Sequence, residues 1–102
     1  MIEIDTGRAA VIVDGVTHEP EPKVYRLILL LARRPQIIRT HGQILDAMGS
    51  PFSGPDAVTT AVKKARRVVG APSIRVRTGL GYIWGSTPTR IIEGGGAEHG
   101  AV

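Results

Sequence analysis

Residues 56–84, DAVTTAVKKARRVVGAPSIRVRTGLGYIW, decide the fold of this chain. They contain a helical pattern, a Gly-Ala-Pro break and two strand patterns around a glycine-rich turn. Apolar residues recur at i, i+4, i+7 and i+11, which places them on one stripe of an α-helix over about 56–69. The stripe consists of Val58, Val62, Ala65 and Val69. The side chains that point away from it, toward solvent or a partner, are those of Thr59, Thr60, Lys63, Lys64 and Arg67.

Positive charge is concentrated in this part of the chain. The net charge is +4, but residues 1–22 carry five acids and one base, whereas residues 57–92 carry seven bases and no acid. A run of charge alone is typical of a solvated surface. Here it continues from a helix into a hairpin, which favours a polyanionic partner because a one-sided basic patch attracts phosphates.

Length and composition indicate a single domain. The chain has 102 residues, 42% of them hydrophobic, and no cysteine, which excludes a disulfide framework and a thiolate metal site. No apolar run approaches the roughly eighteen residues of a membrane span. The N-terminus, MIEIDTG, carries acids where a signal peptide has bases. We therefore expect a cytoplasmic protein that does not associate with membranes.

The residues before this stretch predict a small sheet followed by an apolar helix. Residues 2–18 form two or three short strand patterns, with a hairpin turn at Asp14-Gly15. Pro22 is suited to the first turn of a helix over about 22–34, and Pro35 ends it. This helix is the most apolar segment, so we expect it at the centre of the core.

A short second helix and a turn-rich loop connect this helix to the basic one. Thr40 and Gln43 have the spacing of a capping box, which opens a helix that Gly49 ends as its C′ residue. Residues 49–55, GSPFSGP, then form a loop of small residues around Phe52.

The end of the stretch predicts a β-hairpin over 74–84. Apolar residues and arginines alternate in residues 74–77, so one face is apolar and the other basic. Gly79-Leu80-Gly81 supplies the turn, and we expect Tyr82 and Trp84 to pack on the core. From Gly85 onward the pattern is lost. We therefore expect a domain over residues 1–86 and a flexible tail over residues 87–102.

This order of elements resembles the winged-helix DNA-binding domain of OmpR/PhoB-type response regulators over residues 2–84. Residues 77–82, RTGLGY, are similar to the wing of that family, and residues 58–67 to its recognition helix. The resemblance implies an α+β winged helix-turn-helix with a small N-terminal antiparallel sheet, three helices and a C-terminal β-hairpin wing. Thr78 stands where the family usually has arginine. The chain contains no receiver domain, so it is either a free-standing effector domain or a piece of a longer regulator.

The resemblance implies a transcriptional regulator that binds double-stranded DNA, as a tandem dimer on direct repeats. The helix over about 56–69 would enter the major groove, and the wing would lie on the adjacent minor groove or backbone. A helix N-terminus attracts anions, so the start of the second helix is a further candidate for phosphate contact. The candidate DNA-binding residues are Thr40, His41, Thr59, Thr60, Lys63, Lys64, Arg66, Arg67, Arg75, Arg77 and Thr78.

The alternative is a winged helix whose basic face docks an acidic protein partner, such as RNA polymerase. The resemblance also implies that loop 49–55, with Phe52, can contact RNA polymerase. The acidic N-terminal region also allows a homodimer, in which it meets the basic side of a second copy. We expect no enzymatic activity, cofactor or metal, because His18, His41 and His99 are far apart and no HExxH motif, carboxylate pair or dinucleotide fingerprint occurs.

Overall fold

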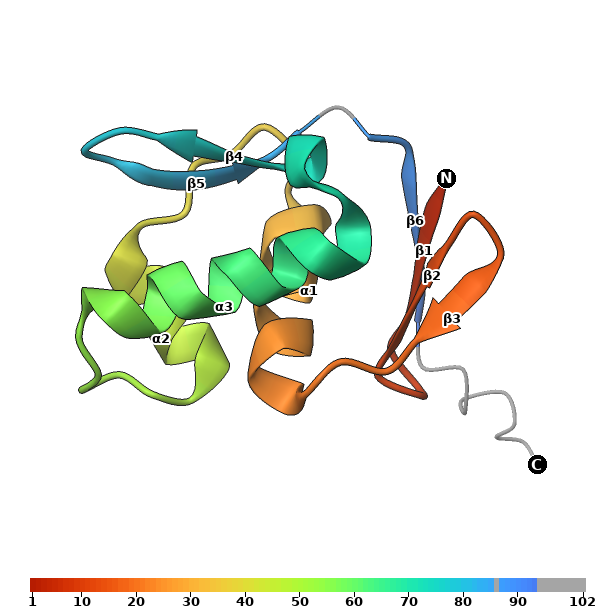
Figure 1. Cartoon of the computed structure of the whole chain (residues 1–102), viewed down its shortest axis with the longest axis horizontal. Coiled ribbons are helices and arrows are strands. Elements are labelled where there is room, and N and C mark those ends of the chain that lie inside the picture. Colours follow the sequence, from red (N-terminus) through yellow and green to blue (C-terminus); the bar gives the residue numbers. More distant parts are fainter. Residues whose placement is uncertain (86, 94–102) are drawn as a thin grey trace.

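The computed structural model, which describes residues 1–85 and 87–93, contains three α-helices and two small β-sheets, the smaller of which lies along one side of the helices (Figure 1). The larger sheet lies at one end of the long axis. The tip of the second sheet, a hairpin, lies at the other end, together with the second helix (Figure 1). The expected order of sheet, three helices and hairpin is confirmed.

The larger sheet has four strands in the order β3-β2-β1-β6. Strands β1 (Ile2–Asp5), β2 (Ala10–Val13) and β3 (Val16–His18) form antiparallel pairs. The β2–β3 turn contains Asp14 and Gly15, both with positive φ, as expected of a tight hairpin. Side chains alternate across β1, so Ile2 and Ile4 are buried while Glu3 faces outward.

Strand β6 (Thr89–Ile92) corrects the expected boundary of the domain. It pairs with β1 in parallel, which makes the sheet mixed and not purely antiparallel. Glu93 then forms an ion pair with Arg33, with Oε2 at 2.8 Å from Nη1. The expected tail is therefore wrong for residues 87–93, and the rest of it, residues 94–102, lies outside the described residues.

Helix α1 (Pro22–Arg33) is central to the core, as predicted. Its buried face includes Leu27, Ile28 and Leu31, which belong to one apolar cluster together with residues of the other two helices and both sheets. Burial also raises the pKa of Tyr25 above its ordinary value of 10.0, an effect that the positive charge of Arg33 opposes.

Helix α2 (His41–Met48) begins and ends as its sequence predicts. The Thr40 hydroxyl accepts a hydrogen bond from the Gln43 amide at 3.2 Å, and the Gln43 side chain accepts one from the Thr40 amide at 2.9 Å. Gly49 adopts the left-handed conformation and closes the C-terminus. The capping box thus fixes the start of α2.

Helix α3 (Pro55–Val69) begins after Gly54 and ends at Gly70. The predicted stripe is buried together with Ala61, and α3 packs against α1 and α2. A single 3₁₀ turn, η1 (Ala71–Ser73), leads into the hairpin.

The hairpin consists of β4 (Ile74–Arg77) and β5 (Gly81–Trp84). The segment between α1 and α2 pairs with β5 through one antiparallel bridge. In this bridge Arg39 and Tyr82 exchange main-chain hydrogen bonds of 2.8 and 3.0 Å. A Cβ atom on Gly81 would collide with the Arg39 carbonyl group, so only glycine allows this approach. Tyr82 and Trp84 are buried, which confirms their expected packing on the core.

Candidate nucleic-acid interface

The outer face of α3 carries Thr60, Lys63 and Arg67, which follow one another at i, i+3 and i+7 and are all exposed. Asp56 precedes them on the same face, in the first turn, where its charge is favourable to the helix dipole. Within the described residues, no ion pair or hydrogen bond engages the side chains of Lys63 and Arg67. Both cations are therefore available to an external anion.

Two further predicted residues flank this face. The Thr59 hydroxyl donates to the carbonyl oxygen of Pro55 at 3.4 Å and remains exposed on the side nearer the hairpin. On the opposite side, Lys64 forms an ion pair with Glu21, with Nζ at 3.3 Å from Oε2. The structure therefore places an acidic group from the start of α1 beside a predicted DNA-binding residue.

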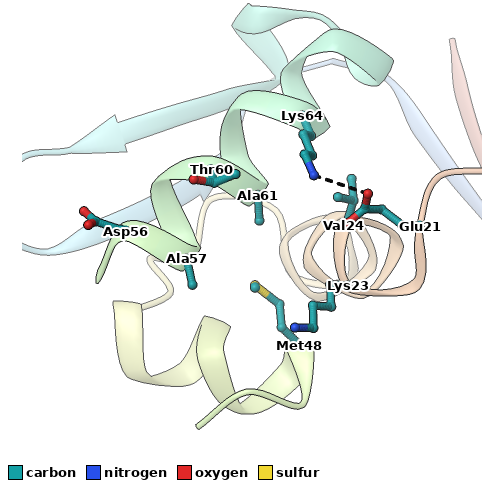
Figure 2. A pocket seen from close by; sticks show the side chains of 9 residues that line it. All are labelled: Glu21, Lys23, Val24, Met48, Asp56, Ala57, Thr60, Ala61 and Lys64. Carbon is teal, nitrogen blue, oxygen red and sulfur yellow. Dashed lines mark hydrogen bonds and ion pairs between the residues drawn. The ribbon is translucent and has the colours of Figure 1, made fainter. Parts of the chain in front are cut away.

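A shallow hollow of about 310 Å³ lies beside α3 at this ion pair. Figure 2 shows the Lys64 side chain pointing toward Glu21. Val24 and Met48 form the apolar part of the wall of the hollow. Two acidic and two basic side chains line it, so it does not form a site of one charge.

Arg66, a predicted DNA-binding residue, is engaged within the protein. It is half-buried, and its Nε and Nη2 atoms donate to the carbonyl oxygen of Ile74 at 3.1 and 2.8 Å. These bonds join α3 to the first strand of the hairpin. Arg66 therefore positions the hairpin and does not project from the outer face of α3 with Arg67.

The hairpin presents three predicted residues to solvent: Arg75, Arg77 and Thr78 are all exposed. The turn is closed by a hydrogen bond of 2.8 Å from the Leu80 amide to the Arg77 carbonyl oxygen, with Gly79 at positive φ. The basic groups of α3 and of the hairpin thus belong to adjacent elements, which Arg66 holds together.

The start of α2 lies against the hairpin. The His41 ring packs edge-on against the Tyr82 ring, with 5.7 Å between the centroids. The Thr40 hydroxyl caps α2 and is still exposed. Both predicted residues therefore lie near β5, although each also has a structural role.

Sequence reasoning missed three residues of this region. Arg39 precedes the capping box, and its Nε is buried without a hydrogen-bond partner among the described residues. Val76, on the apolar face of the predicted hairpin, is 55% exposed, and Leu80 at the turn is 53% exposed. The alternation in residues 74–77 indicates on which face of the hairpin Val76 lies. It does not indicate that the hairpin extends beyond the core and leaves Val76 exposed.

The described residues contain no group of three His, Cys, Asp or Glu side chains that could hold a metal ion. In the same part of the chain, no helix combines the length and apolar character needed to cross a membrane.

Comparison with known proteins gives a structural match but no sequence match. No protein-family model and no curated protein matches the chain. Among solved structures, the DNA-binding domain of the response regulator AdeR, in complex with an intercistronic region, matches with a TM-score of 0.74 and 20% identity. The match covers 82% of this chain and 93% of that one. At this identity the likeness establishes the fold, and the chain has the winged helix-turn-helix fold of a response-regulator DNA-binding domain.

Proposed function

We propose that this chain binds double-stranded DNA and regulates transcription, with α3 in the major groove and the hairpin as a wing on the adjacent minor groove or backbone. The observation that carries this proposal is the exposed face of Thr60, Lys63 and Arg67 on α3, whose two cations have no partner within the described part of the chain. The fold shared with the AdeR domain, which was solved with an intercistronic region, supports it.

On α3, Lys63 and Thr60 are the residues we assign to base edges. Lysine donates to guanine O6 or N7, and a threonine hydroxyl or methyl group contacts a base or a thymine methyl. Thr59 flanks them on the wing side. Arg67, one turn further from the start of α3, is assigned to a phosphate, as is Lys64 once it leaves Glu21.

The wing and the start of α2 supply the outer contacts. Arg75, Arg77 and Thr78 are assigned to the minor groove or its phosphates. Thr40 and His41, at the first turn of α2, are assigned to a phosphate because free amide groups and the helix dipole attract anions there. Arg66 acts indirectly, by holding the wing against α3.

The test is fluorescence anisotropy of labelled duplex DNA at low salt, with charge-reversal variants of exposed bases. Lys63→Glu and Arg67→Glu should each weaken binding at least about tenfold, since each converts a phosphate or base contact into repulsion. Arg8→Glu is the matched control, because Arg8 is exposed in the β1–β2 turn of the distant sheet and the charge change is the same. Equal losses in all three variants would contradict a site on α3.

A second candidate function is docking to RNA polymerase through loop 49–55. The observation in its favour is Phe52, which is 100% exposed between α2 and α3. Phe52→Ser should abolish capture of purified RNA polymerase without changing DNA affinity. A homodimer on direct repeats is proposed on the resemblance alone, and sedimentation of the chain with one-repeat and two-repeat duplexes tests it.

A further inference from the structure

The outer side of α1 carries a stripe of basic and apolar side chains that neither the core nor the proposed DNA interface uses. This stripe, which we call the α1 stripe, consists of Arg26, Leu29, Leu30 and Arg33. The four residues follow one another at i, i+3, i+4 and i+7, so they share one side of the helix, opposite its buried face. The two arginines are exposed and the two leucines are only partly buried.

A shallow groove of about 230 Å³ lies on the α1 stripe. The stripe forms one side of this groove, and Ala47 of α2 lines the other. The leucines and Ala47 supply its apolar lining, and the arginines supply its charged lining. No residue of α3 or of the hairpin lines the groove, so it is separate from the proposed DNA-binding face.

The charged side chains that line the groove are all positive, and α1 itself contains no acidic residue. At one end Arg33 already binds a carboxylate, because its Nη1 and Nη2 atoms donate to Glu93 at 2.8 and 3.2 Å. The Arg26 side chain forms no ion pair or hydrogen bond with any residue that the structure describes. The other end of the groove is therefore available to an acidic group of a partner.

The spacing of the two arginines favours a helical partner. Seven residues of an α-helix rise about 10.5 Å, so acids seven residues apart on a second helix that lies alongside α1 match both arginines. Apolar residues at i+3 and i+4 of that helix then meet the two leucines. Anchors at i, i+3, i+4 and i+7 are also the pattern by which a groove binds an amphipathic helix.

We propose that the α1 stripe docks an amphipathic helix of a partner protein, with acidic residues at i and i+7 and apolar residues at i+3 and i+4. One acid pairs with Arg26, and the other shares Arg33 with Glu93. The apolar residues between them pack against Leu29 and Leu30. The inference does not depend on DNA binding, and a helix docked in the groove leaves the outer face of α3 free.

The test is fluorescence anisotropy of a labelled peptide titrated with the full chain. The probe peptide has glutamates at i and i+7 and leucines at i+3 and i+4, in a background of alanine and glutamine that favours a helix. In one control peptide the residues at i+5 and i+7 are exchanged, which moves the second glutamate to another side of the helix. In a second control peptide serines replace the leucines. Both control peptides should bind at least about fivefold more weakly than the probe.

Arg26→Glu should weaken binding of the probe at least about fivefold, because an attraction becomes a repulsion. Arg34→Glu is the matched control, since Arg34 is exposed at the end of α1, does not line the groove and undergoes the same charge change. It should weaken binding less than about twofold. A peptide with lysine in place of one glutamate should bind Arg26→Glu more tightly than the wild type.

Three results would overturn the inference: no binding of the probe to the wild type, equal binding of the probe and the control peptides, or equal losses in Arg26→Glu and Arg34→Glu. Circular dichroism melting shows whether both variants remain folded. The two variants should bind duplex DNA with equal affinity, so a failure of the wild type to bind DNA would contradict only the proposed function.

Two other occupants of the groove have their own measurements. Self-association of the wild type in sedimentation that Arg26→Glu abolishes would assign the groove to a second copy of the chain. Flotation with phosphatidylglycerol vesicles that the same substitution abolishes would assign it to an anionic membrane surface. Either result would overturn the proposed helical partner.

Discussion

The guanidinium group of Arg66 in α3 donates two hydrogen bonds to the carbonyl oxygen of Ile74 in β4, at 3.1 Å from Nε and 2.8 Å from Nη2. One side chain thereby connects the helix proposed to read DNA with the wing beside it. Its neighbour Arg67 is exposed on the outer face of α3. Two adjacent arginines thus have separate roles, which substitutions can distinguish.

Arg66→Ala should lower the free energy of unfolding by about 1–2 kcal/mol, because a partly buried carbonyl group loses charged donors. Arg67→Ala should change it by no more than about 0.5 kcal/mol, as is usual for an exposed residue. Urea unfolding measures both. Equal stability of the two variants would contradict the positioning role of Arg66.

Gly81→Ala should destabilise the protein by more than about 2 kcal/mol, since a Cβ atom would collide with the Arg39 carbonyl group and separate β5 from the segment before α2. Gly79→Ala is the matched control. Gly79 also has positive φ, but nothing lies within 4 Å of its would-be Cβ, so only a conformational cost of about 1 kcal/mol remains. Thermal melting compares the two variants, and a smaller effect at Gly81 than at Gly79 would argue against the close packing of the wing.

The ion pair of Glu21 and Lys64 predicts that one substitution strengthens DNA binding. Glu21→Gln should raise affinity about twofold to threefold at low salt, because it removes an acid beside α3 and releases Lys64 for a phosphate. Stability should change little, since exposed ion pairs contribute at most about 1 kcal/mol. Anisotropy titration measures the affinity, with Glu19→Gln as control because Glu19 is exposed and near in sequence. The same gain in both variants would show a general charge effect.

Strand β6 predicts where the chain can be shortened. A chain that ends at Pro88 should be less stable than one that ends at Glu93 by more than about 2 kcal/mol. The shorter chain loses the β1–β6 ladder and the ion pairs of Arg90 with Glu3 and of Glu93 with Arg33. Equal stability of both chains, measured by urea unfolding, would contradict the role of β6 in the sheet.

Local sequence patterns were sufficient to predict most of the fold. The capping box at Thr40 and Gln43, the apolar stripe of residues 58–69 and the glycine turn of the wing all act through neighbouring residues. Strand β6 was missed because only four residues form it, after a break in the pattern, and its partner β1 lies at the other end of the chain. A short local pattern contains no information about such a partner.

The candidate site was predictable in composition but not in detail. Helical spacing placed Thr60, Lys63 and Arg67 on the exposed face. It could not show that Arg66 bonds to Ile74 or that Lys64 meets Glu21, 43 positions away, because both contacts depend on tertiary packing. The exposure of Val76 and Leu80 likewise depends on how far the hairpin extends beyond the helices.

The central claim is that free cations on α3 and the wing neutralise DNA phosphates, and the salt dependence of duplex binding tests it most directly. With phosphate contacts from Lys64, Arg67, Arg75 and Arg77, log affinity should fall against log salt with a slope of about −3.6, and of about −1.8 in the variant Arg67→Ala with Arg77→Ala. A wild-type slope near zero, or an unchanged slope in the double variant, would contradict the proposed interface.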